Sequence, residues 1–151
     1  MTELSAQQTA DFVGNGMFAN DRAVQGLNIR LASIAPGRAA MTMAVGEHML
    51  NGHETCHGGF IAVLADSAFA YACNSYGEAT VASGFSIDFM APARSGDVLT
   101  ASSVEVSRAG RTGVYDTEVT NQRGERIAVF RGRSYTLKGK PAVMKTITQG
   151  D

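Results

Sequence analysis

The order of apolar and polar positions predicts a short helix and a hairpin at the start of the chain. Residues 3–19 are expected to form the helix, which offers Leu4 and Phe12 for docking. Leu27–Ile34 and Ala39–Val45 are expected to be strands. A Pro-Gly pair at 36 and 37 suits a type II turn between them, so these two strands form the hairpin.

A long apolar helix and a series of strands are predicted for the rest of the chain. After a polar loop at 46–56, the helix is expected from about Gly58 to Tyr76, with Gly77 as its C-cap. Because it is apolar on nearly every side, it must be covered on most of them. The strand candidates after it are Thr80–Met90, Val98–Ser107, Gly113–Thr120 and Arg126–Leu137. This order predicts an α+β fold in which an antiparallel sheet wraps around one helix.

The length of 151 residues suits a single domain, 1–151. Its core is expected at about 20–138, followed by a loose tail at 139–151. The methionines at 41, 43 and 90 are expected to fill the core rather than to act in function.

Charge and composition narrow the class of protein. The formal net charge is −1, with 13 basic and 14 acidic residues spread along the chain, so neither nucleic acid nor a membrane surface is an expected partner. Cys56 and Cys73 form neither a CxxC pair nor a disulfide framework. The polar start lacks the features of a signal peptide, and the apolar stretch 60–73 is too short to span a membrane. A cytoplasmic protein is therefore expected.

Asp66 stands in the middle of the apolar helix. Burying an ionised carboxylate without a partner is costly, so the position needs a reason. Either the side chain reaches solvent or an arginine, or it is kept for chemistry. The residues three and four positions away include no basic partner, which favours a chemical role.

His57-Gly58-Gly59 opens the same helix. Free backbone N–H groups at a helix start, with the positive end of the dipole behind them, suit an oxyanion. Two glycines would also let another molecule approach closely, although for this motif alone a tight loop-to-helix turn is the favoured explanation.

The spacing of these two features points to two chains. His57 and Asp66 are nine residues apart, which puts them on opposite faces of a helix and about 13 Å apart along its axis. One small carbonyl cannot easily reach both within one chain. Two antiparallel copies of the helix about a two-fold axis would bring His57 and Gly58 of one chain to Asp66 of the other.

Three segments carry a resemblance to a known family. They read LNGHETCHGGFIAVLADSAFAYACNSYG, VASGFSIDFMAPARSGDVLTA and GVYDTEVTNQRGERIAVFRGRS. The chain resembles the hotdog-fold acyl-CoA thioesterases over about residues 15–137, and it is most similar to their phenylacetic-acid-degradation (PaaI-like) branch. The resemblance implies a long central helix wrapped by a five- to six-stranded antiparallel sheet. It also implies a homodimer with shared active sites, assembled into a homotetramer as a dimer of dimers.

The resemblance assigns roles to single residues. Asp66 would be the catalytic carboxylate, as general base or nucleophile. Gly58 would offer its N–H to the thioester oxygen, and His57 would position or polarise that carbonyl. Asn20 resembles the asparagine that orients the reacting water or carboxylate, on a short match. Phe60, beside Gly59, would help shape the acyl pocket.

The expected substrate is phenylacetyl-CoA, a ring-hydroxylated relative or a similar short aryl acyl-CoA, and coenzyme A enters only as part of it. Hydrolysis of an activated thioester requires no metal, and no metal-ligand spacing or GxSxG elbow is evident, so no cofactor is expected. Arg94 and Arg111 could hold coenzyme A phosphates, or they could be solvated turn residues. Ser83 could line the pocket or be an ordinary strand residue.

Other functions stay open at this point. A hotdog hydratase or dehydratase of acyl-CoA is the first, although the His-Gly-Gly start and the position of Asp66 argue against it. A non-catalytic acyl-CoA-binding regulator is the second, but the roughly 20 residues before Asn20 are too few for a DNA-binding module. An inactive scaffold subunit is the third.

Overall fold

The computed structural model describes residues 2–144. Its helices are α1 (Ala6–Asn20), α2 (Arg22–Gly26), the short 3-10 helix η1 (Glu47–Met49) and α3 (Gly58–Asn74). Its strands are β1 (Arg30–Ala35), β2 (Arg38–Ala44), β3 (Glu78–Phe89), β4 (Val98–Ala109), β5 (Thr112–Thr120) and β6 (Arg126–Pro141).

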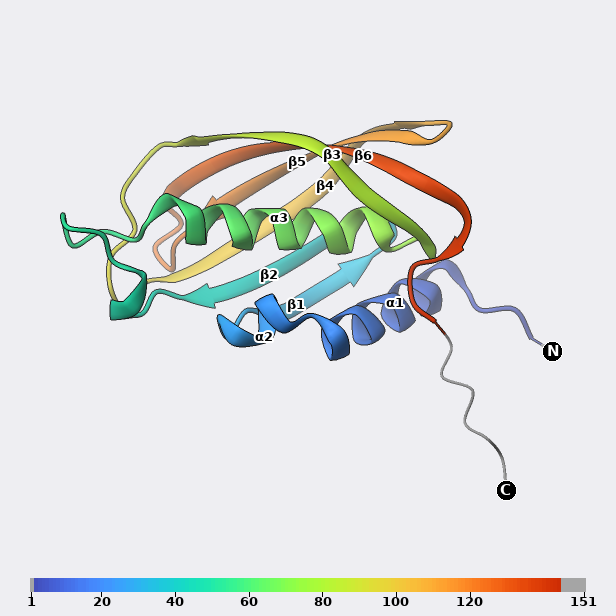
Figure 1. The fold of residues 1–151 in the computed structure, drawn as a ribbon, viewed down its shortest axis with the longest axis horizontal. Helices are drawn as coiled ribbons and strands as arrows, with labels where there is room; N and C mark the ends of the chain where they lie inside the picture. Colours follow the sequence, from blue (N-terminus) through green and yellow to red (C-terminus); the bar gives the residue numbers. More distant parts are fainter. Residues whose placement is uncertain (1, 145–151) are drawn as a thin grey trace, which may run out of the picture.

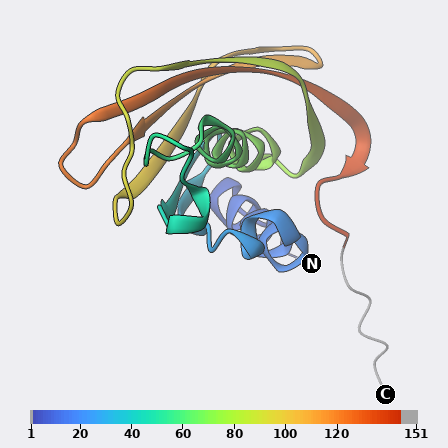
Figure 2. The same ribbon diagram turned by 60° about the vertical axis from the view of Figure 1, so that its left-hand side comes forward.

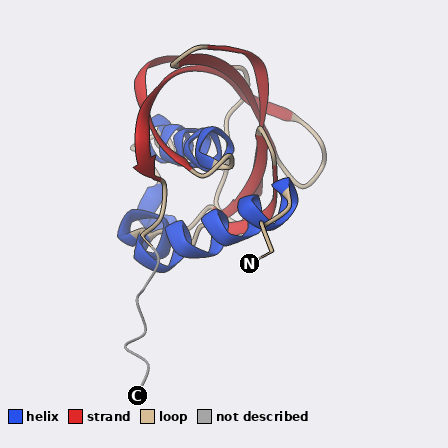
Figure 3. Ribbon diagram, turned by 90° about the vertical axis from the view of Figure 1, so that its right-hand side faces the viewer, coloured by secondary structure: helices blue, strands red, loops and turns tan. Residues whose placement is uncertain are grey.

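The six strands form one antiparallel sheet in the order β1-β2-β4-β5-β6-β3. Figure 1 shows the sheet arching over α3, and the end-on view in Figure 3 shows it curling around that helix. The predicted α+β hotdog architecture, with a long central helix and a wrapped sheet, is therefore confirmed. Figure 2 shows α1 on the other side of α3 from the arch, where it packs against β1 and α3.

The all-round apolar sequence of α3 is explained by its surroundings. Leu64, Ala65, Ala68 and Phe69 are at most 1% exposed, and the helix packs against β2, β3, β4 and β5. Fully burying a large side chain such as that of Leu64 or Phe69 stabilises the fold by about 1.5–3 kcal/mol. Gly132 of β6 makes room for this packing, because a Cβ there would lie 2.8 Å from the ring of Phe69.

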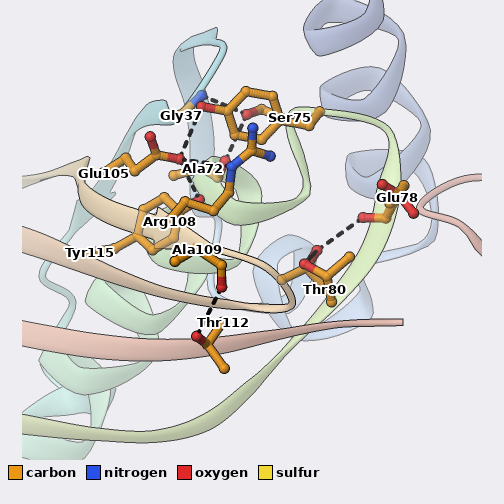
Figure 4. Close-up of polar contacts among 12 residues, drawn as sticks. Gly37, Ala72, Ser75, Glu78, Thr80, Glu105, Arg108, Ala109, Thr112 and Tyr115 are labelled. Carbon is orange, nitrogen blue, oxygen red and sulfur yellow. Dashed lines mark hydrogen bonds and ion pairs between the residues drawn. The ribbon is translucent and has the colours of Figure 1, made fainter. Parts of the chain in front are cut away.

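The C-terminal end of α3 is fixed by a polar cluster (Figure 4). The Ser75 hydroxyl accepts the N–H of Gly37 at 2.8 Å and donates to the carbonyl of Ala72 at 2.7 Å. Glu105 of β4 accepts the hydroxyls of Tyr76 and Tyr115, and Arg108 lies 3.6 Å from the centre of the Tyr76 ring. The hairpin turn, β4 and β5 therefore hold this end of α3 in place.

The N-terminal region differs from the prediction. Ser5 and Gln8 form a capping box that starts α1 at Ala6, three residues later than expected. The helix ends at Asn20, and Asp21 immediately caps a second helix, α2, that the pattern did not predict. Because α2 runs to Gly26, the first strand begins at Arg30 rather than at residue 27.

Two further expectations needed correction. Met41 and Met43 are buried as predicted, but Met90 is 54% exposed and does not fill the core. The loose tail expected from residue 139 is wrong for its first residues, since β6 continues to Pro141 and the N–H of Ala142 donates to the carbonyl of Gly77. The rest of that tail, 145–151, lies outside the described residues.

Candidate active site

Asp66 lies halfway along α3 and is partly exposed. Within residues 2–144 its carboxylate has no hydrogen bond and no ion pair. Burial raises the pKa of Asp66, and the negative charge of Asp21 raises it further. The arginine partner considered for Asp66 is thus absent from the described residues, and the carboxylate is partly exposed with a raised pKa.

Asp21 was not singled out in the sequence, although it follows Asn20 directly. One of its oxygens caps α2 by accepting the N–H of Val24 at 3.2 Å. The other accepts the hydroxyl of Tyr71, a fully buried residue of α3, at 3.2 Å. The only sequence signal was its place as a capping residue, which does not reveal the contact with α3.

The start of α3 carries the second group of predicted residues. His57 is the N-cap, and its Nδ1 accepts the N–H of Gly59 at 3.4 Å. The N–H of Gly58 has no acceptor within residues 2–144. The free donor at this helix terminus is therefore the Gly58 N–H, with the positive end of the helix dipole behind it.

The two glycines of this turn have different surroundings. A Cβ at Gly58 would lie 2.8 Å from the ring of Phe89, so the group that approaches closely here is an aromatic side chain of the same protomer. A Cβ at Gly59 would meet only His57, at 3.7 Å, so that side is open. Of the two glycines, Gly59 therefore leaves room for another molecule as expected, whereas Phe89 fills the space beside Gly58.

Phe60 lies beside a mostly apolar pocket of about 380 Å³. The pocket is lined by Leu27, His57, Gly59, Phe60 and Val63. His48 meets Phe60 edge to face at 6.5 Å between ring centres and supports it from the loop. Neither Leu27 nor Val63 was predicted for this pocket. Leu27 reaches α3 only through α2, a helix that the sequence pattern did not predict.

Asn20 is exposed at the end of α1, where its side-chain amide donates to the carbonyl of Gly16 at 3.2 Å. Its neighbour Asp21 is near enough to Asp66 to affect its pKa. The structure thus brings the Asn20 region towards the middle of α3, while His57 and Gly58 lie at the helix start. From Gly58 to Asp66 the helix rises by about 12 Å, so these two groups lie apart within one protomer.

The remaining predicted residues lie in different places. Arg94 is exposed, and the neighbouring Ala93 carbonyl accepts the N–H of Cys56, so this turn lies beside the start of α3. Arg111 lies in the turn after β4, beyond the opposite end of that strand. A 12-residue strand spans about 40 Å, so one protomer cannot use Arg94 and Arg111 on the same coenzyme A phosphate.

Ser83 lies on β3, and its hydroxyl donates to the backbone carbonyl of Arg133 at 3.2 Å. The β3 residue that touches Gly58 is Phe89, about 20 Å further along the strand. Ser83 therefore lies apart from the Gly58 turn of its own chain.

No group of three or more His, Cys, Asp or Glu side chains in residues 2–144 is arranged to hold a metal ion. None of the helices in this range has the length and apolar character needed to cross a membrane.

Comparison with known proteins places this geometry in a family. Residues 53–128 match the thioesterase superfamily. The chain is 47% identical to the acyl-coenzyme A thioesterase PaaI of Escherichia coli (strain K12) over 125 residues, which are 83% of this chain and 89% of that protein. The solved structure of the E. coli PaaI protein from the phenylacetic acid degradation operon has a TM-score of 0.88 and 45% identity, covering 90% of this chain and 99% of that one. The structure of smu.793 from Streptococcus mutans bound to acetyl CoA has a TM-score of 0.70 and 28% identity, covering 72% and 88%.

A carboxylate in the middle of the wrapped helix and a free amide at its start are groups of the kind that thioester hydrolysis needs. The chain belongs to the thioesterase superfamily, and it is an enzyme of the thioester-hydrolase class. Within the superfamily it belongs with PaaI, as the sequence motifs indicated.

Proposed function

We propose that the protein hydrolyses phenylacetyl-CoA, a ring-hydroxylated phenylacetyl-CoA or a similar short aryl acyl-CoA to the free acid and coenzyme A. The observation that carries this proposal is the partly exposed Asp66 carboxylate, which has no partner in the described residues and a raised pKa. The similar PaaI protein of E. coli is named an acyl-coenzyme A thioesterase, and its structure is described as coming from the phenylacetic acid degradation operon.

Asp66 supplies the base or the nucleophile. In one route it takes a proton from water as the water oxygen attacks the thioester carbon. In the other it attacks that carbon itself, and water then hydrolyses the mixed anhydride. In both routes the tetrahedral oxyanion collapses and expels the coenzyme A thiolate. A positioned general base contributes about 10²–10⁴-fold to such a step.

Gly58 supplies the oxyanion donor. Its N–H is free within the described residues, and it begins a 17-residue helix whose dipole favours negative charge at this end. His57 lies beside it and orients the carbonyl. Removing one oxyanion donor costs about 10²–10³-fold in rate. Because a thioester is already activated, a few such groups are enough to catalyse its hydrolysis.

The acyl group fits the apolar pocket beside Phe60. Leu27, Phe60 and Val63 provide apolar walls, and His57 and Gly59 border the side nearest the helix start. A volume of about 380 Å³ is ample for a phenyl ring with a methylene linker. This lining favours an aryl or short apolar acyl group over a charged one.

A second copy of the chain completes each site. Among the described residues β3 pairs with β6 alone, which leaves its other edge unpaired there. Phe85, Phe89 and Met90 beside this edge are 43–54% exposed. The residues that α3 leaves partly open after its first turn are Ala62, Val63, Asp66 and Ala70, whose small side chains permit close helix packing. Pairing two β3 edges about a two-fold axis would cover both features and bring Gly58 of one chain to Asp66 of the other.

A panel of acyl-CoA thioesters tests the proposal, with thiol release measured by a thiol reagent. We expect phenylacetyl-CoA or a hydroxyphenylacetyl-CoA to give the highest kcat/KM, ahead of acetyl-CoA and palmitoyl-CoA. Asp66→Asn should lose at least about 10²-fold in kcat on every substrate. A wild-type rate on all thioesters equal to the uncatalysed rate, or an Asp66→Asn variant as fast as the wild type, would refute the proposal.

A further inference from the structure

Asp21 occupies the joint between α1 and α2. Its two carboxylate oxygens are used separately: Oδ1 accepts the Val24 N–H at 3.2 Å and Oδ2 accepts the Tyr71 hydroxyl at 3.2 Å. The first bond starts α2, and the second bond crosses to α3, 50 positions later in the chain. One side chain therefore ties three helices together.

The bond to Tyr71 is favoured because the tyrosine is buried. Its ring is 0% exposed and lies in the hydrophobic core. Leaving a buried hydroxyl without an acceptor costs about 1–3 kcal/mol, so the bond to Asp21 is strongly favoured. Asn20, the residue directly before Asp21, is thereby held at a fixed position relative to α3.

Asp21 also places a negative charge beside the catalytic carboxylate. Within residues 2–144 its carboxylate forms no ion pair. Burial raises the pKa of Asp66, and the charge of Asp21 raises it further. On α3 itself, burial raises the pKa of Tyr71 and raises that of Cys73 to about 12, so both stay neutral at neutral pH.

We propose that Asp21 is a positioning residue of the active site, which fixes Asn20 relative to α3 through Tyr71 and supplies the negative charge that tunes Asp66. The inference rests on the proposed function in so far as Asp66 is the reacting carboxylate. The bond to Tyr71 positions the joint. The charge of Asp21 adds to the effect of burial in keeping the proton affinity of Asp66 high.

The pH dependence of kcat/KM distinguishes an effect of the Asp21 charge from an effect of Asp21 on the fold. Asp21→Asn keeps an oxygen for the Val24 N–H but removes the charge, whereas Asp21→Glu keeps the charge. Loss of the charge lowers the pKa of Asp66, so the ratio of kcat/KM at about pH 5 to that at about pH 8 should rise at least about twofold in Asp21→Asn. Asp21→Glu should keep the wild-type ratio. An unchanged ratio in Asp21→Asn overturns the role of the charge.

Tyr71→Phe tests the positioning role. It removes the hydrogen bond across to α3 and leaves the charge of Asp21 in place. The pH ratio should stay as in the wild type while kcat falls about three- to tenfold, because the Asn20 region is less well held. A kcat equal to that of the wild type overturns the positioning role.

A measurement that does not depend on activity keeps the inference separate from the proposed function. ¹³C NMR of the aspartate carboxyl groups, with Asp66 assigned by its loss in Asp66→Asn, follows the titration of Asp66 directly. Its midpoint should move to lower pH in Asp21→Asn, and an unmoved midpoint contradicts the inference. If Asp21→Asn does not fold, Asp21→Ser takes its place, since serine also caps a helix. A wild-type protein that hydrolyses no CoA thioester would refute the proposed function, while this titration still decides the role of Asp21.

Discussion

At the scale of single residues, Asp66 shows a conflict between stability and chemistry. A partly buried carboxylate with no hydrogen bond in the described residues does nothing for the fold when it is ionised. The same absence of partners leaves it available to water or to a thioester carbon. The sequence predicted this residue because an acid in an apolar helix stands out. Asp21 could not be predicted, because its effect depends on a contact between α3 and a helix that the pattern did not show.

Asp66→Asn should therefore stabilise the folded protein at neutral pH. Because the folded-state pKa of Asp66 is raised, its contribution to stability is fully present below its unfolded pKa and is lost as pH rises through the folded value. The variant should melt a few degrees higher than the wild type at pH 7, and the difference should vanish as pH falls towards about 4. Thermal unfolding from about pH 3.5 to 8 measures this. A wild type that is as stable as Asp66→Asn at pH 7 would contradict the argument.

At the scale of elements, contacts with other segments hold both ends of α3. The sequence predicted the helix but not these contacts. The strands β2, β4 and β5 and the body of α3 follow from local patterns and were predicted within a few residues. The contact of Phe89 with Gly58, and the cluster of Tyr76, Glu105 and Arg108, join segments far apart in the chain and have no local signature. The His-Gly-Gly motif was therefore recognised, while the reason for its first glycine was not.

The free N–H at the start of α3 can be removed without breaking the helix. Proline is favoured at the first helical position, and His57, at φ −60° and ψ 133°, already has the conformation that a residue before proline prefers. Gly58→Pro removes the N–H, whereas Gly58→Ala adds a Cβ and keeps it. Both changes are made in a Phe89→Ala background, which removes the ring that a Cβ would meet.

We expect the proline variant to have about 10²–10³-fold lower kcat than the alanine variant, with similar thermal stability. Thiol-release kinetics and melting curves on the matched pair measure this. Equal kcat values would show that the Gly58 N–H does not stabilise the oxyanion.

At the scale of the whole molecule, the protomer is an incomplete catalyst by the proposed mechanism. Its donor and its carboxylate are about 12 Å apart along one helix, and the edge strand β3 and the open residues of α3 lie where a second copy could cover them. A two-fold axis would bring the donor of each chain to the carboxylate of the other and so form two equivalent sites. The sequence predicted this arrangement from spacing alone, since the rise of an α-helix is constant.

Mixing two inactive variants tests this arrangement. In a heterodimer of Asp66→Asn with Phe89→Ala/Gly58→Pro, one site combines the intact Gly58 of the first chain with the intact Asp66 of the second, and the other site carries both defects. If each site is shared, heterodimers purified with two different tags should have roughly half of the activity of the wild type per dimer. If each site lies within one chain, every site in the heterodimer is damaged and the activity stays at the level of the parent variants. The mixed dimer of wild type with Asp66→Asn serves as the control, because it should retain roughly half of the activity under either arrangement.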